Sequence, residues 1–239
     1  MKTAILISGH LRTFDLCLPT LRWHLFRKYP DADFFVSTVR DEDSHKVGLI
    51  EDLNPRVQVV EEQPDCVDHI ADVMGCERES VERFAAHAPY AISVPPQAIL
   101  AQLWQLQECF NLIEIPEEYH TFIRVRPDIF IHSFAKPMLM ADGEATTPWW
   151  GRFGGVNDRL AVMGPKAAAG YFGTYDATPG LLRDGCPLHP ESLVKASVER
   201  GGCWTSPKLS AEFSKYGQTG KMIRFWGHEV LPCDTPPYC

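Results

Sequence analysis

Short apolar runs alternate with longer amphipathic segments along the first part of the chain. The runs at 3–8, 33–39 and 56–61 have the length of strands that are buried on both faces of a sheet. Residues 14–29 and 97–114 carry apolar side chains at helical spacing, so they predict helices that each bury one face. Strand, helix and strand in this order are typical of an α/β fold with a mostly parallel central sheet flanked by helices.

The later part of the chain has shorter elements and a different mixture of residue types. The expected elements are strands at 119–125, 159–163 and 222–226 and helices at 165–175 and 190–200. The charged segment 62–95 is expected to form a peripheral excursion that is helical around 67–74 and 79–87. Tryptophan, phenylalanine and glycine gather at 149–155, which predicts a folded loop over a site.

Size and composition favour one domain that spans residues 1–239. The chain has 239 residues, of which 45% are hydrophobic, and this is enough to build a core without disulfides. Its 23 Lys and Arg stand against 31 Asp and Glu, and the net charge of −8 disfavours nucleic acid and anionic membranes as partners. The balance leaves room for a local basic site that takes one phosphorylated ligand.

Two further features bear on the compartment. No apolar run approaches the roughly 18 residues of a membrane span, so no transmembrane segment is expected. The eight cysteines form no CxxC pair and fit no zinc site, and a reducing cytoplasm is the expected location. In an oxidising compartment Cys233 and Cys239 could form a disulfide.

The first candidate for chemistry is the segment Ser8-Gly9-His10-Leu11-Arg12, which follows the first predicted strand. Ligands of open α/β sheets bind outside the carboxyl ends of the strands. There Gly9 allows close approach of the backbone, Ser8 can hydrogen-bond, and Arg12 can hold a phosphate with two donors. An ordinary strand-to-helix turn explains the same residues, and neither a GxGxxG nor a P-loop motif is present.

The second candidate is Arg124-Val125-Arg126-Pro127-Asp128. Strand alternation places Arg124, Arg126 and Asp128 on one side, where two guanidinium groups and a carboxylate suit a phosphate and a metal. The carboxylate of Asp128 is a hard ligand for Mg²⁺ or Mn²⁺, which would bridge it to a diphosphate. A structural Arg–Asp ion pair is the alternative explanation.

Later segments add candidates that each have a structural alternative. Asn157 and Asp158 follow two glycines and can bind hydroxyl groups, and Asp158 could act as a general base, but an Asx turn explains them equally well. Trp150 is either a platform for a sugar ring or part of the core. His228 could be a second metal ligand, and Glu191 could bind substrate, although an acidic residue in a first helical turn ordinarily serves the helix dipole.

Three of these motifs, taken in order, resemble a group of bacterial and viral glycosyltransferase-like proteins of the GT-A type. The shared motifs are a first strand that ends in Ser-Gly-x-x-Arg, a central Arg-x-Arg-Pro-Asp, and Asn-Asp before an apolar strand and a glycine, here at 8–12, 124–128 and 157–164. The resemblance spans roughly residues 5–175, and the middle motif is its most specific part. It implies a nucleotide-diphospho-sugar fold with a nucleotide-binding part at 1–135 and an acceptor side at 136–239.

The resemblance also implies roles for residues. Ser8, Gly9, Arg12 and Arg124 would bind the nucleotide sugar, such as a UDP- or GDP-sugar, and Asp128 matches the last Asp of the usual DxD metal motif. Arg126 stands where that motif has its first acidic residue. Either Asp128 holds Mn²⁺ or Mg²⁺, with His228 as a second ligand, or the arginines partly replace the metal in neutralising the leaving diphosphate.

The implied reaction transfers a sugar to a hydroxyl group of a glycan or another acceptor. Positive charge from Arg126 and its neighbours would stabilise the departing diphosphate. In an inverting enzyme Asp158 would take the proton of the acceptor, whereas in a retaining enzyme it would only bind sugar. The rival hypotheses are a sulfotransferase or nucleotidyltransferase, or a binding module of the same fold without activity.

Overall fold

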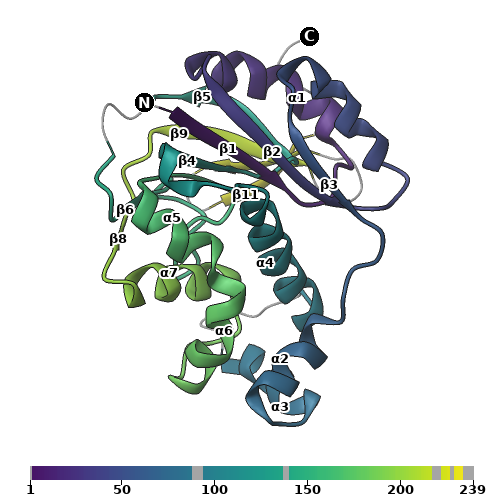
Figure 1. Ribbon diagram of the computed structural model, residues 1–239, viewed down its shortest axis with the longest axis vertical. Helices are drawn as coiled ribbons and strands as arrows, with labels where there is room; N and C mark the ends of the chain where they lie inside the picture. Colours follow the sequence, from purple (N-terminus) through teal and green to yellow (C-terminus); the bar gives the residue numbers. More distant parts are fainter. Residues whose placement is uncertain (1, 88–93, 137–139, 217–221, 227–228, 234–239) are drawn as a thin grey trace.

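Figure 1 shows a computed structural model of the protein, which describes residues 2–87, 94–136, 140–216, 222–226 and 229–233. The strands of its larger sheet are β1 (Lys2–Ser8), β2 (Ala32–Val39), β3 (Arg56–Val60), β4 (Tyr119–Val125), β6 (Glu144–Thr146), β7 (Leu160–Met163) and β8 (Trp204–Ser206). The strands of the smaller sheet are β5 (Ile129–Phe134), β9 (Ala211–Tyr216), β10 (Met222–Trp226) and β11 (Glu229–Cys233). The α-helices are α1 (Phe14–His24), α2 (Cys66–Met74), α3 (Arg78–Arg83), α4 (Pro96–Asn111), α5 (Pro165–Phe172), α6 (Thr174–Arg183) and α7 (Pro190–Arg200). Short 3₁₀ segments lie at Phe26–Lys28, Ser44–Leu53, Phe84–His87 and Pro116–Glu118.

The seven strands of the larger sheet have the order β3-β2-β1-β4-β7-β6-β8. Strands β3, β2, β1 and β4 pair in parallel, β7 runs antiparallel to both of its neighbours, and β8 is parallel to β6. At the centre, Ile5 of β1 stands between Phe34 of β2 and Ile123 of β4. The expected α/β architecture with a mostly parallel sheet is therefore confirmed, and it has the strand order of a Rossmann-like fold in its first half.

Strands β1 and β2 are buried on both faces, as their continuous apolar runs predicted, whereas the edge strand β3, also expected to be buried, is exposed or half-buried. Ala4 and Leu6 of β1 pack in a core shared with α4, α5, α6 and α7, whereas Ile5 and Ile7 pack on the other face with α1 and strands β5 and β9. Figure 1 shows α1 on one side of the sheet and α4 and α5 on the other. Burial of alternate residues on opposite faces explains why β1 has no polar position between residues 4 and 7.

The observed elements refine the sequence predictions. The helix expected at 14–29 ends at His24, and the chain continues through Leu25 into a 3₁₀ turn. The helix expected at 165–175 stops at Phe172, where Gly173 separates it from a further helix that the pattern did not predict. Strands β6, β8 and β9 were also unforeseen, because they are short or polar in part. The loop expected at 149–155 is present, and it contains neither helix nor strand.

Within the described residues, no helix has both the length and the apolar character needed to cross a bilayer.

Candidate functional site

A cavity of about 540 Å³ lies at the carboxyl ends of β1 and β4. Its walls come from the turn after β1, the end of β4, the first turns of α4 and α7, the loop before β7, and β9. Eight of the residues singled out in the sequence line it: Ser8, Gly9, Arg12, Arg124, Arg126, Asp128, Asp158 and Glu191. Ser8 and Arg126 meet there because the parallel strands β1 and β4 end at the same edge of the sheet. Asp158 reaches this edge because it precedes the antiparallel strand β7, and Glu191 comes from the first turn of α7.

The charge of the cavity is opposite to that of the whole chain. Its cationic lining residues are Arg12, Arg124, Arg126, Arg159 and Lys215, and its carboxylic acids are Asp128, Asp158 and Glu191. An excess of fixed positive charge in a concave site attracts anions and raises their local concentration. The arrangement therefore favours an anionic ligand over a cation.

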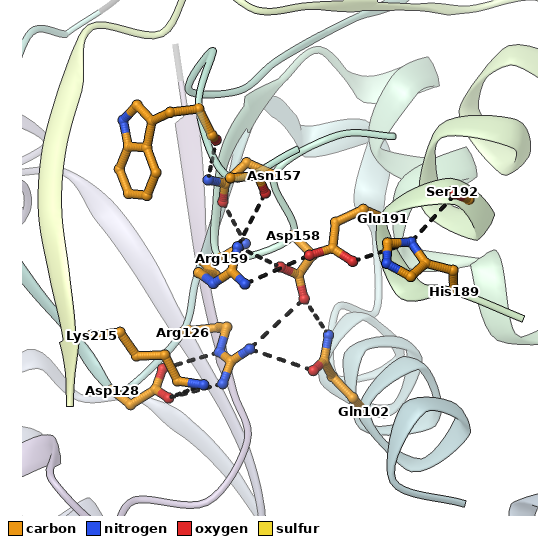
Figure 2. Close-up of polar contacts among 12 residues, drawn as sticks. Gln102, Arg126, Asp128, Asn157, Asp158, Arg159, His189, Glu191, Ser192 and Lys215 are labelled. Carbon is orange, nitrogen blue, oxygen red and sulfur yellow. Dashed lines mark hydrogen bonds and ion pairs between the residues drawn. The ribbon is translucent and has the colours of Figure 1, made fainter. Parts of the chain in front are cut away.

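Arg126 and Asp128 form a bidentate pair at the end of β4 (Figure 2). Arg126 Nε donates to Asp128 Oδ1 at 3.0 Å and Nη2 donates to Oδ2 at 2.8 Å, while Lys215 Nζ lies 3.7 Å from Oδ2. Burial raises the pKa of Asp128, but the charges of Arg126 and Lys215 outweigh it and hold that pKa below its ordinary value. The carboxylate is thus ionised and shared by two cations.

Asp158 accepts one hydrogen bond and forms two longer ion pairs. Gln102 Nε2 from α4 donates to Asp158 Oδ2, Arg159 Nη1 lies 3.4 Å from Oδ1, and Arg126 Nη1 lies 3.8 Å from Oδ2. The side chain is nearly fully buried, which raises its pKa, but Arg159 and Arg126 outweigh burial and lower that pKa. Asp158 is therefore a fixed anion at neutral pH.

Glu191 has the opposite protonation tendency. Burial, followed by the charge of Asp158, raises the pKa of Glu191 to about 8, even though Arg159 Nη2 lies 3.6 Å from its Oε1. His189 Nδ1 lies 3.5 Å from Glu191 Oε2, and burial lowers the pKa of this imidazole. A pair of carboxyl groups whose environments push their pKa values apart is typical of sites that perform proton transfer.

A close backbone approach fixes the position of Glu191. Gly155 lies against the start of α7, where Val156 N donates to Glu191 O at 3.1 Å. A Cβ atom on Gly155 would stand 2.0 Å from that carbonyl oxygen, so only glycine fits. The neighbour that requires glycine at this position is therefore the backbone of helix α7.

Several residues that line the cavity carry a buried polar atom without a hydrogen-bond partner among the described residues. These atoms are Ser8 Oγ, Thr13 Oγ1, Gln105 Nε2, Arg124 Nε and Asp158 Oδ1, the last of which faces Arg159 Nη1 at 3.4 Å. Leaving a buried donor unpaired costs about 1–3 kcal/mol, so folded proteins rarely keep several of them in one place without use. Their presence in one cavity indicates a site built for a polar ligand.

The turn after β1 has the geometry expected for a ligand-binding loop. Gly9 has a φ of +127°, a conformation that side-chain-bearing residues rarely adopt, and its N–H donates to Ser37 O at 3.2 Å. The next residue, His10, is bonded through Nδ1 to Asp41 Oδ2 at 2.8 Å. Arg12 is exposed and lines the cavity mouth, where its guanidinium can reach a ligand.

Two predicted substrate residues do not line the cavity. Trp150 is 7% exposed, packs against the tilted ring of Phe213 with ring centroids 4.4 Å apart, and donates from Nε1 to Ala211 O, so its ring belongs to the core. Asn157 is fully buried, donates from Nδ2 to Trp150 O at 2.9 Å, and accepts from Arg159 N. These bonds shape the loop that carries Asp158, which makes both residues structural. His228 and Cys239 lie outside the described residues.

Sequence reasoning missed several residues of the cavity. Lys215 gave no signal because β9 was not recognised. Gln102 and Gln105 are polar positions within the helix predicted at 97–114. Gln105 is almost completely buried, so a polar residue on an apolar helix face was a usable signal for the site. The pattern indicates Arg159 only as the start of a strand, whereas in the structure it forms ion pairs with both Asp158 and Glu191.

The residues around Asp128 do not fit a resident divalent cation. Mg²⁺ and Mn²⁺ prefer several free oxygen ligands, whereas both oxygens of Asp128 are bonded to a guanidinium group. Over the stretches of chain that the structure describes, no group of three or more His, Cys, Asp or Glu side chains could hold a metal ion. The expected role of Asp128 as a metal ligand therefore finds no support in its surroundings.

The fold and the cavity together define an α/β protein with a cationic site at its strand ends. The chain belongs to the DUF7796 family, described as a domain of unknown function, whose model matches residues 1–172. No curated protein matches the chain. The matched segment contains Ser8, Arg126 and Asp158 but ends before Glu191 and Lys215.

Proposed function

We propose that the protein is a glycosyltransferase that transfers a sugar from a nucleotide-diphosphate sugar to a hydroxyl acceptor. The observation that carries this proposal is the composition of one cavity, in which unpartnered buried donors and an excess of cations adjoin a pair of carboxyl groups with opposed pKa shifts. The resemblance of three motifs to GT-A type proteins supports the same reaction.

In this reaction the cationic side chains of the cavity bind the diphosphate. Arg12, Arg126 and Lys215 line the side of the cavity near the ends of β1 and β4, where a leaving diphosphate gains negative charge as its bond to the sugar breaks. Donors that are already in place need not reorganise when this charge develops. Arg124, which is buried and whose Nε has no hydrogen-bond partner among the described residues, adds a further donor.

The acceptor binds at the carboxyl groups of Asp158 and Glu191. The acceptor oxygen forms a bond to the anomeric carbon, the bond from that carbon to the phosphate oxygen breaks, and its electron pair leaves with the diphosphate. The hydroxyl proton moves to Glu191, because a carboxylate with a raised pKa is a better base than Asp158, whose pKa is lowered by two arginines. This assignment replaces Asp158, the base expected from the sequence, with Glu191 and leaves Asp158 to orient Arg126 and Arg159.

A screen of UDP-, GDP- and dTDP-sugars for hydrolysis and for transfer to glycan acceptors tests the proposal. We expect release of nucleoside diphosphate from one donor class, and a loss of about 10²–10⁴-fold in rate for Glu191→Gln. The matched control is Asp72→Asn, which changes an exposed acid on α2 outside the cavity. Binding of nucleotide without turnover of any donor would favour a binding module of the same fold over an enzyme.

A further inference from the structure

Each carboxylate in the cavity already faces an arginine. Asp128 is bonded to Arg126 through both oxygens, and Arg159 lies within 3.6 Å of both other carboxyl groups, those of Asp158 and Glu191. A divalent cation bound to Asp128 would have to displace the guanidinium group of Arg126 from its buried pair. The cation and the displaced guanidinium group would then be two positive charges close together in a buried site. An anion meets no such cost.

Lys215 stands at the open side of the bidentate pair. It reaches from β9 of the smaller sheet, and Figure 2 shows its ammonium group beside Asp128 and near Arg126. The charge of Arg126, followed by burial, lowers the pKa of Lys215, which means that the two cations repel each other across one shared carboxylate. A dianion bound between them would relieve this repulsion.

We propose that the cavity binds the diphosphate of its ligand without a divalent cation, with Lys215 and Arg126 supplying the positive charge that a metal would otherwise supply. This inference rests on the proposed function in taking the ligand to be a nucleoside diphosphate. It assigns a specific role to Asp128, whose carboxylate positions the guanidinium group of Arg126 and keeps Arg126 and Lys215 charged beside each other. Asp128 is then a positioning residue and not a metal ligand.

Calorimetric titration of the full chain with inorganic pyrophosphate and with UDP and GDP tests the inference, once in EDTA and once in Mg²⁺ or Mn²⁺. We expect affinity for pyrophosphate and for one of the two nucleotides in EDTA that changes less than about threefold when metal is added. A lysine that bonds an anionic oxygen contributes about 1.5–3 kcal/mol, so Lys215→Met should weaken binding at least about tenfold. Lys215→Arg should recover most of it, because the charge is restored.

Two further variants make the test specific. Lys208→Met removes an exposed lysine outside the cavity and should leave binding unchanged. Asp128→Asn keeps the shape of the side chain but loosens the bidentate hold on Arg126, so any change in pyrophosphate affinity should be the same in EDTA and in metal. A metal ligand at this position would instead give a loss of binding that is confined to Mg²⁺ or Mn²⁺.

The outcomes separate the inference from the proposed function. Absence of pyrophosphate and nucleotide binding in EDTA, or a loss in Asp128→Asn that is confined to Mg²⁺ or Mn²⁺, overturns the inference even if a nucleotide sugar is turned over with metal present. Binding in EDTA that depends on Lys215, together with no turnover of any donor, upholds the inference and overturns the transferase. A melting curve for each variant shows whether a loss of binding comes from unfolding.

Discussion

The carboxyl group of Glu191 should make the stability of the protein depend on pH in a way that one substitution removes. An unfolded chain loses the Glu191 proton near the ordinary value of 4.5, whereas the folded protein keeps it until about pH 8. Between these values the folded state binds more protons than the unfolded state, so the free energy of unfolding falls as pH rises. Glu191→Gln mimics the protonated form and has no proton to lose.

The size of the effect follows from the shift. Each pKa unit corresponds to about 1.4 kcal/mol, so Glu191→Gln should gain stability over wild type progressively from about pH 5 and reach a difference on the order of 5 kcal/mol above pH 8. For a chain of this length, about 1 kcal/mol shifts the melting temperature by roughly 2–4 °C. Melting temperatures of the two proteins should therefore coincide near pH 5 and differ by on the order of 10 °C above pH 8.

Urea unfolding of both proteins at a series of pH values measures the difference directly. The groups around Glu191, namely Asp158, Arg159, Arg126 and His189, are present in both proteins, so the difference reports the carboxyl group of Glu191 together with its coupling to them. Because the charge of Asp158 is the second cause of the raised pKa, the gain should shrink when both proteins also carry Asp158→Asn. A difference that stays constant from pH 5 to pH 8.5 would refute the raised pKa and with it the choice of Glu191 as the base.

Three further predictions concern the same region. Gly155→Ala places a methyl group 2.0 Å from the carbonyl oxygen of Glu191 and should lower the free energy of unfolding in urea by at least about 2 kcal/mol. Gly201→Ala, whose added methyl group would lie 3.5 Å from its nearest neighbour, should lower it much less. Equal losses in the two variants would contradict the close approach. Asn157→Ala removes two buried hydrogen bonds and should destabilise the protein by about 1–3 kcal/mol, and an unchanged melting temperature would speak against its structural role. The transfer rate at low substrate concentration should rise from pH 6 to about pH 8, as Glu191 loses its proton, and a flat or falling profile would exclude it as the base.

The parts of the fold that could be predicted are those that local pattern determines. Strand β1 is a continuous apolar run because both of its faces are buried, and α4 carries its core residues at helical spacing. The run at Ala211–Tyr216, by contrast, mixes charged and apolar residues. Ala211 and Phe213 pack in the core, and Lys215, which follows on the same side of β9, lines the cavity. Such a strand becomes recognisable only when its partner β5 is known.

The candidate site could be predicted in its location and in part of its pairing. Alternation along the strand indicated that Arg126 and Asp128 share a side, and the rule for parallel sheets indicated that they meet Ser8 at one edge. The ion pair between Arg126 and Asp128 is the alternative that the sequence left open, whereas the approach of Lys215, 87 residues away, had no local signal. Glu191 has the sequence context of an ordinary helix-dipole residue, and only its burial and the neighbouring Asp158 distinguish it.

The central claim, that this cavity holds a nucleoside diphosphate, is tested most directly by the melting temperature of the protein in UDP and in GDP. A ligand at about 100 times its dissociation constant adds about 2.7 kcal/mol, which corresponds to a rise of several degrees for a chain of this length. Arg12→Met, at the exposed mouth of the cavity, should reduce that rise, and Arg27→Met, an exposed arginine outside the cavity, should not. No rise with either nucleotide, or equal rises in both variants, would contradict the claim.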